Sequence, residues 1–176
     1  LTADHGEALG EHGLFGHGMS LYRPEIHVPL LILDPSGSSA GQRVSTPVSP
    51  RDIAATVVDA LDLSLDSPFP GYSLVPLWTR PDTASVRSDT SVTSVVQIVK
   101  KPVSEPRPHH APAYNGTLTS LVLDDKLYIR DAFGREELYD LNSDPGESNN
   151  LAEHVEMVPV IRRGRAAFER IWSTEH

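Results

Sequence analysis

The first eighteen residues gather side chains that could bind a cation or move a proton. The stretch from Leu1 to Gly18 contains three histidines and three acidic residues among five glycines. Carboxylate and imidazole groups supply the oxygen and nitrogen donors that divalent cations take. Glycine lets the backbone adopt positive φ and lets a ligand approach closely. Packing alone does not require such a density of ligand groups, so this segment is the first candidate for a functional site.

Asp4 and His5 are adjacent in this stretch, which restricts where they could act together. Neighbouring residues cannot share one face of a regular helix or strand. They can converge on one ion where the chain leaves a strand and turns, at the carboxyl end where open α/β sheets bind ligands. We therefore expect a metal site at a strand exit. The alternative is that Asp4 caps a turn and His5 is a hydrogen-bonded core residue.

The order of motifs along the chain resembles the C-terminal part of sulfatases, which belong to the alkaline-phosphatase-like superfamily. The motifs are Thr2-Ala3-Asp4-His5-Gly6-Glu7, Gly10-Glu11-His12-Gly13, Gly16-His17-Gly18, Ser20-Leu21-Tyr22, Val28-Pro29-Leu30-Leu31-Ile32, Glu137-Leu138-Tyr139-Asp140-Leu141, Asp144-Pro145-Gly146-Glu147 and Asn150-Leu151-Ala152. The first block is quite specific, the last is moderately so, and the middle of the chain matches loosely. The resemblance implies an α/β fold: the C-terminal part of an alkaline-phosphatase-like sandwich, with a small antiparallel sheet subdomain packed against a C-terminal helix.

The resemblance also implies roles for single residues. Asp4 and His5 match the paired ligands of the family's metal, most often Ca²⁺, with Mn²⁺, Zn²⁺ and Mg²⁺ as alternatives. His17 matches the position that contacts the sulfate oxygens or helps to protonate the leaving group, and we expect it to be catalytic. A protonated histidine suits this task because it places a donor and positive charge where negative charge develops. Four further residues are expected to support the site from behind or to line a substrate pocket, namely Glu7, Glu11, His12 and Tyr22.

The chain departs from the family pattern at the nucleophile. Sulfatases use a formylglycine made from the first residue of a Cys/Ser-x-Pro-x-Arg motif, whereas these 176 residues contain no cysteine. The nearest imitation is Ser104-Glu105-Pro106-Arg107, in which the arginine is misplaced. We expect the chain to be a C-terminal fragment that carries half of an active site, to depend on the upstream part of the same catalytic domain, and to be inactive and a weak metal binder alone.

Three functions remain open at this stage. The first is a metal-dependent sulfuric ester hydrolase acting on a small sulfate ester or a sulfated glycan. The second is a phosphonate or phosphate mono- or diester hydrolase of the same superfamily. The third is a non-catalytic relative that binds an anion or a glycan. The resemblance would place such a protein in the periplasm or outside the cell, and the residues themselves assign no location.

Composition excludes some classes of function. The formal net charge of −9 is balanced by no basic stripe, which argues against a nucleic-acid binder. The late arginines Arg162, Arg163, Arg165 and Arg170 are explained by a solvated helix face. No apolar run approaches the ~20 residues that span a membrane.

The pattern divides the chain at residues 80 and 116. Residues 1–80 should belong to the catalytic α/β domain, with a strand at Val28–Leu33 that is covered on both faces. A helix capped by Ser49 should follow, presenting Ile53, Val57, Ala60 and Leu61 to the sheet.

Residues 81–116 are rich in proline and serine, with one possible strand at Ser94–Val99 and an exposed loop that carries His109 and His110. Residues 117–176 should form an antiparallel meander and a covering helix. Its strands are expected at Leu118–Leu123, Lys126–Arg130 and Glu136–Leu141, and the helix from about Pro159 with Ile161, Phe168, Ile171 and Trp172 buried.

Overall fold

The computed structural model describes residues 1–34, 37, 40–63, 69–79, 92–96 and 111–174. These residues form two compact units, one made of Leu1–Leu30 with Thr93–His176 and the other of Leu31–Val92. The first unit holds every motif of the opening segment and all of the four-stranded sheet except Val92. The division of the chain at residues 80 and 116 stays a prediction.

The sheet of the first unit is a four-stranded meander in the order β3-β4-β5-β6. Its strands are β3 (Val92–Val96), β4 (Leu118–Leu123), β5 (Lys126–Asp131) and β6 (Glu136–Asp140). A two-residue turn joins β4 to β5, because Leu123 pairs with Lys126 and Asp124 takes positive φ. The predicted meander and its Asp124–Asp125 hairpin are confirmed. The predicted strand at Ser94–Val99 overlaps β3, and residues 97–110, which include His109 and His110, lie outside the described part of the chain.

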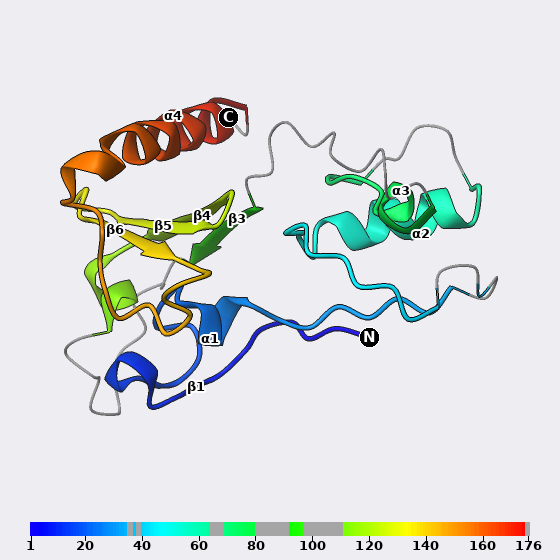
Figure 1. Ribbon diagram of the computed structural model, residues 1–176, viewed down its shortest axis with the longest axis horizontal. Helices are drawn as coiled ribbons and strands as arrows, with labels where there is room; N and C mark the ends of the chain where they lie inside the picture. Colours follow the sequence, from blue (N-terminus) through cyan, green and yellow to red (C-terminus); the bar gives the residue numbers. More distant parts are fainter. Residues whose placement is uncertain (35–36, 38–39, 64–68, 80–91, 97–110, 175–176) are drawn as a thin grey trace. The chain divides into compact units, whose positions relative to one another are not determined.

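Both faces of this sheet are covered, because successive side chains point to opposite sides. Leu121, Leu123, Tyr128 and Leu138 pack against α4 (Val158–Thr174) through Ile161, Ala167 and Phe168. Leu118, Leu127, Ile129 and Tyr139 pack against the opening segment through Leu14, Leu21 and Tyr22. Figure 1 shows α4 on one side of the strands and α1 (Arg23–Ile26) on the other. The sheet therefore supports the candidate functional segment as well as the helix.

The contact between α4 and the sheet is close at one glycine. A Cβ added at Gly164 would lie 2.4 Å from the Tyr128 ring, so only glycine lets the helix sit at this distance. The predicted covering helix is confirmed and begins at Val158, with Ile161 and Phe168 buried. The side chains of Ile171 and Trp172 lie outside the described set. Arg162, Arg163 and Arg165 face solvent as expected.

The second unit contains α2 (Asp52–Ala60) and α3 (Val75–Thr79). The predicted helix is present, but its predicted buried stripe is wrong, since Val57 and Leu61 are exposed. The buried face carries Asp52, Ala55 and Thr56 instead. The reason is hydrogen bonding: Asp52 accepts the Tyr72 N–H at 2.9 Å, and Thr56 Oγ1 accepts the Leu74 N–H at 2.9 Å. A returning loop thus covers the polar side of the helix.

The predicted strand at Val28–Leu33 is also wrong for the described residues. Its single ladder contact is an antiparallel bridge between Leu30 and Thr2. Leu31, Ile32 and Leu33 are exposed, with 94% of Leu33 accessible. A strand is stabilised by hydrogen-bonded neighbours on its edges, and one bridge does not provide them. No helix among the described residues has the length and apolar character needed to cross a membrane.

Candidate functional site

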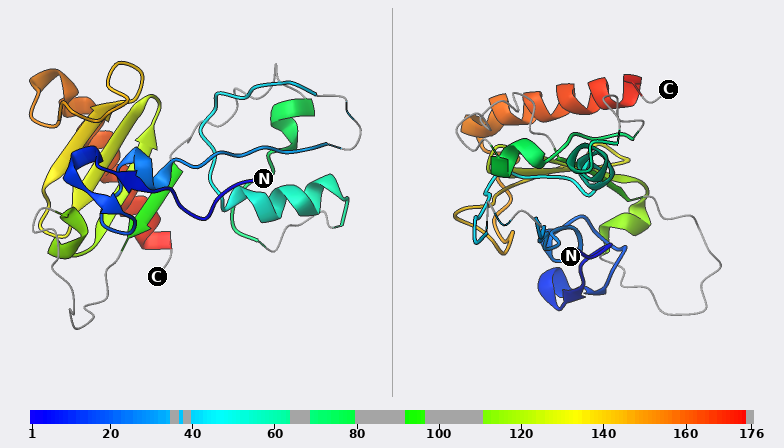
Figure 2. Two further views of the ribbon diagram at one scale, coloured as in Figure 1. Left: turned by 90° about the horizontal axis from the view of Figure 1, so that it is seen from below. Right: turned by 90° about the vertical axis from the view of Figure 1, so that its right-hand side faces the viewer.

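A short hairpin brings the acidic and basic groups of the opening segment together. Strand β1 (Ala8–Leu9) pairs with β2 (Phe15–Gly16), and the turn η1 (Glu11–Gly13) connects them. Ala8 lies opposite Gly16, so the residues just outside this pair, Glu7 and His17, also face each other. Their side chains meet with His17 Nδ1 2.9 Å from Glu7 Oε2. Figure 2 shows this segment from two further directions.

His5 lies against this pair. Its ring stacks on that of His17, with centroids 3.9 Å apart and planes 28° apart. His5 Nδ1 lies 2.8 Å from the Gly6 carbonyl, which can only accept, so Nδ1 carries the hydrogen and Nε2 is left for a ligand. The same reasoning applied to the Glu7 carboxylate places a hydrogen on His17 Nδ1. Both histidines therefore present their Nε2 atoms.

Together His5, Glu7 and His17 can offer one ligand atom each within 4.8 Å of one another. All three side chains are exposed, so a cation or an ester could reach them from solvent. The hydrogen bond to Gly6 is the main cause that raises the pKa of His5; partial desolvation opposes it, and the carboxylates of Asp4, Glu7 and Glu25 add to the rise. A cation that binds His5 through Nε2 would compete with a proton for that nitrogen.

Asp4 lies beside this cluster. Its side chain is 90% exposed, its Oδ1 accepts the His5 N–H at 3.1 Å, and its Oδ2 is 3.8 Å from His5 Nε2. Among the described residues, the structure thus groups His5 with Glu7 and His17, and Asp4 lies beside the His5 imidazole. Two imidazoles with carboxylates suit Mn²⁺, Zn²⁺ or Fe²⁺ at least as well as Ca²⁺, which prefers oxygen ligands.

Gly6 fixes the position of the segment against α1. Its N–H donates to the Glu25 carbonyl at 2.8 Å, and a Cβ at this position would lie 2.0 Å from the Pro24 carbonyl oxygen. A side chain at residue 6 would therefore push away the backbone that carries His5 and Glu7.

Glu25 holds the other end of the segment, after His17. This carboxylate is buried and accepts the N–H groups of Met19 at 2.9 Å and Ser20 at 3.3 Å, together with the Ser20 hydroxyl. Glu25 was not among the residues predicted from the sequence. It is the third residue of the four-residue helix α1, and a helix this short has no periodicity that would indicate which side chain is buried.

A second cluster from the same segment is buried. The His12 ring stacks on Tyr22 at 3.7 Å and 9°, and its Nε2 lies 3.9 Å from Glu147 Oε2 without a hydrogen bond. Glu147 is almost fully buried and accepts the Arg23 N–H on both oxygens, at 3.2 and 3.0 Å. His12 and Tyr22, two of the predicted supporting residues, therefore join the opening segment to the turn after β6.

Burial sets the protonation of this second cluster. It lowers the pKa of His12, with Glu137, Asp144 and Glu11 opposing the change. It raises the pKa of Glu147 to about 7, against the lowering effect of Arg23. Glu11 has a local task instead, because its Oε2 accepts the Leu9 N–H at 2.6 Å and closes the hairpin turn.

Comparison with known proteins gives one family. The family model described as Sulfatase matches residues 1–63. Arylsulfatase K of Xenopus laevis is 33% identical over 158 residues, which are 88% of this chain and 28% of the relative. The chain therefore spans less than a third of the length of this relative.

Solved structures agree with the family match. A protein bound to D-glucosamine-2-N,6-O-disulfate, described as its substrate, superposes with a TM-score of 0.73 at 24% identity, over 98% of this chain and 33% of that one. A phosphonate monoester hydrolase of Agrobacterium radiobacter gives a TM-score of 0.71 at 25% identity, over 98% of this chain and 33% of that one. The chain therefore has the fold of these two proteins, as expected from the motif order.

Proposed function

The chain belongs to the sulfatase family, and we propose that it supplies the metal-binding and leaving-group side of a sulfuric ester hydrolase. The observation that carries this proposal is the Glu7–His17 pair, joined at 2.9 Å and stacked on His5 in an exposed position. In this proposal the nucleophile, a formylglycine, comes from outside the 176 residues, because they contain neither cysteine nor a Ser-x-Pro-x-Arg motif.

The residues of this chain divide the work as follows. Glu7 accepts the Nδ1 hydrogen of His17, which orients the ring and leaves Nε2 facing the ester. Protonated His17 donates from Nε2 to the bridging oxygen of the ester as the sulfur–oxygen bond breaks, so the alcohol leaves neutral.

Asp4 and His5 are the residues that would hold the divalent cation, with His5 using the Nε2 that its bond to Gly6 leaves available. The cation supplies charge stabilisation of the sulfate oxygens when it is bound.

The substrate class proposed is a sulfated small molecule or sulfated glycan. A protein of the same fold is described in complex with a glucosamine disulfate as its substrate, which supports the glycan option. Sugar alcohols are poor leaving groups, so a glycan sulfate needs the proton from His17 more than an aryl sulfate does.

This difference gives the experiment. In the full-length protein that carries this chain, His17→Ala should lower hydrolysis of a glucosamine sulfate by at least roughly 100-fold and that of nitrophenyl sulfate far less. Glu7→Gln should show the same selectivity with a smaller loss. The matched control is His154→Ala, since His154 and Glu156 form another exposed histidine–carboxylate pair, at 3.3 Å. Equal losses on both esters would show that His17 does not protonate the leaving group, and absence of turnover on every sulfate ester would refute the proposed function.

The second candidate is hydrolysis of phosphonate or phosphate esters. It is favoured by the structural likeness to the phosphonate monoester hydrolase. The ratio of turnover on phenyl phosphonate esters to turnover on aryl sulfates, measured on the same preparation, separates the two candidates.

A further inference from the structure

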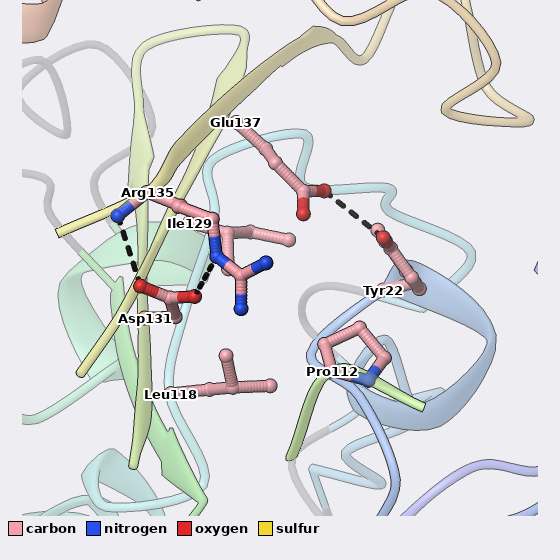
Figure 3. A pocket seen from close by; sticks show the side chains of 7 residues that line it. All are labelled: Tyr22, Pro112, Leu118, Ile129, Asp131, Arg135 and Glu137. Atoms are coloured by element: carbon pink, nitrogen blue, oxygen red, sulfur yellow. Dashed lines mark hydrogen bonds and ion pairs between the residues drawn. The ribbon is translucent and has the colours of Figure 1, made fainter. Parts of the chain in front are cut away.

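A cavity of about 230 Å³ lies in the first unit. Its lining does not include His5, Glu7 or His17. Figure 3 shows the seven residues that line it, namely Tyr22, Pro112, Leu118, Ile129, Asp131, Arg135 and Glu137. The cavity is smaller than the ~300–1,000 Å³ clefts that take drug-sized ligands. It therefore has room for one small molecule or a single ring.

One wall of the cavity presents a fixed acceptor. Glu137 Oε2 accepts the hydroxyl hydrogens of Tyr22 at 3.0 Å and Tyr139 at 2.7 Å. Burial, reinforced by Glu137 itself, raises the pKa of both phenols, so they remain donors. Glu137 Oε1 has no hydrogen-bond partner among the described residues, and in Figure 3 it points into the cavity. One oxygen of the Glu137 carboxylate is thus fixed by the two tyrosines, and the other is available to a ligand.

The opposite wall presents a fixed donor. Asp131 accepts the Arg135 N–H at 2.9 Å and its Nε–H at 2.6 Å, which anchors the guanidinium at its base. The two terminal nitrogens of Arg135 have no hydrogen-bond partner within the described part of the chain, and Figure 3 shows them at the centre of the cavity. The guanidinium carbon lies 5.8 Å from the centre of the Phe133 ring. The Asp131–Arg135 pair is internally neutral, so Glu137 leaves the lining with one net negative charge.

These groups select between classes of ligand. A sulfate or phosphate would satisfy Arg135 but face the unpaired charge of Glu137, and an amine would satisfy Glu137 but face Arg135. A hydroxyl group both donates and accepts, so neighbouring hydroxyls on one ring can satisfy both walls together. Leu118, Ile129 and Pro112 supply the apolar surface on which the C–H face of such a ring can lie.

We propose that this cavity is a binding subsite for a neutral sugar ring, held by Glu137 Oε1 and the terminal nitrogens of Arg135 over Leu118, Ile129 and Pro112. The inference rests on the proposed function where it identifies this ring with an unsulfated residue of a glycan substrate. Tyr22, which follows His17 by five residues, links the subsite to the opening segment.

The test is ligand binding, which does not require hydrolysis. Methyl glucopyranoside, added to the full-length protein, should shift the methyl NMR signals of Leu118 and Ile129, while Leu121 on the α4 face of the sheet should not move. Cyclohexanol, a ring of similar size with one hydroxyl, should bind more weakly, and inorganic sulfate and ethanolamine should leave both signals unchanged.

Two variants decide the assignment. Glu137→Gln keeps an acceptor for the two tyrosines but removes the free carboxylate oxygen, and Arg135→Gln removes the donors from an exposed position; each should weaken glucoside binding about tenfold. Arg163→Gln, which removes an exposed guanidinium paired with Asp124 at 3.0 Å, is the control and should bind normally. Unchanged affinity in both test variants, shifts caused by sulfate or ethanolamine instead, or no shift with the glucoside would each overturn the proposal.

Hydrolysis of nitrophenyl sulfate, measured in parallel, separates this inference from the proposed function because the ester carries no sugar. Turnover of nitrophenyl sulfate without glucoside binding refutes the subsite alone. Glucoside binding without turnover of any sulfate ester refutes the proposed function and leaves the binding site standing.

Discussion

Histidines of the opening segment belong to two clusters that use similar residues in opposite surroundings. His5, Glu7 and His17 form the exposed cluster, in which His17 is 53% and Glu7 46% accessible. His12, Tyr22 and Glu147 form the buried cluster, in which Glu147 is 1% accessible. Each pairs an imidazole with a carboxylate, yet only the exposed cluster can meet a cation or an ester. Burial, rather than residue type, therefore distinguishes the candidate functional cluster from the cluster that joins two parts of the fold.

This difference predicts two kinds of damage. Changes in the exposed cluster should impair activity without changing stability, because few packing contacts are lost. Changes in the buried cluster should impair stability, because they leave a cavity or an unpaired buried group.

The largest effect is expected from Asp4. In the full-length protein, Asp4→Ala should lower turnover by more than roughly 100-fold, because a carboxylate beside the proposed metal ligand His5 is lost. The unfolding midpoint should stay within error of the parent, since the Asp4 side chain is 90% exposed. Turnover and bound metal content are the measurements, with Asp124→Ala as the exposed aspartate control. A variant that keeps its metal and its rate would remove Asp4 from the site.

Gly6 should connect the two kinds of damage. Gly6→Ala places a methyl group 2.0 Å from the Pro24 carbonyl oxygen, so it should cost about 2–3 kcal/mol of stability and also displace the exposed cluster. Gly18→Ala is the matched control, because nothing lies within 4 Å of its Cβ and only the strain of φ +73° remains. Urea unfolding of both variants measures the difference. Equal destabilisation would show that the close approach to α1 costs no more than the backbone strain at Gly18, and that the Pro24 carbonyl can move away from the added methyl group.

The comparison is sharpest between His12 and His5. His12→Ala should cost about 2 kcal/mol, because a ring stacked on Tyr22 and close to Glu147 is lost from a partly buried position. His5→Ala should change stability by less than about 0.5 kcal/mol, because 44% of its side chain is accessible and the residue lies at the surface. Unfolding midpoints measured on the two variants side by side test this. If His5→Ala is the more destabilising, the stacked pair of His5 and His17 is structural, and the exposed cluster loses its functional assignment.

The turns and helices that depend on neighbours in sequence were predictable. The contacts between residues distant in sequence were not. Asp124-Asp125 between two apolar runs predicted the hairpin, and the spacing of Ile161 and Phe168 predicted the covering helix, because both are set by neighbours in sequence. The prediction of a strand at Val28–Leu33 was wrong because a strand depends on partners distant in sequence. Within the described part of the chain, the one bridge that this segment makes is between Leu30 and Thr2.

The site divides in the same way. The ligand-rich segment was found from its composition and motif order, including His17. The difference in burial between His12 and His17 was not predictable, because both residues have glycine neighbours in similar motifs. Side-chain periodicity gives no information about burial in a turn whose residues have positive φ. Likewise Glu137 and Arg135 meet Tyr22 only after the sheet has formed, so their cavity has no signature in the sequence.

The smallest effect is expected from titration of the buried cluster. Glu147 faces His12, the Arg23 backbone, Asp144 and Glu137, and its pKa is raised from 4.5 to about 7, mainly by burial. The folded state therefore holds a proton that the unfolded state releases between about pH 4.5 and 7, so this group makes the protein less stable as pH rises through that window. His12 acts in the opposite direction, because its lowered pKa makes the folded state bind fewer protons below pH 6.5, and the stability contributed by this group rises with pH.

Glu147→Gln removes only the contribution of Glu147. The stability of this variant relative to the parent should then increase with pH across the window, by about 1 kcal/mol after allowance for solvent screening of the pair. Urea midpoints of both proteins at successive pH values measure this difference, and parallel curves would show that Glu147 remains ionised in the folded state and that the buried cluster is an ion pair with a charged His12.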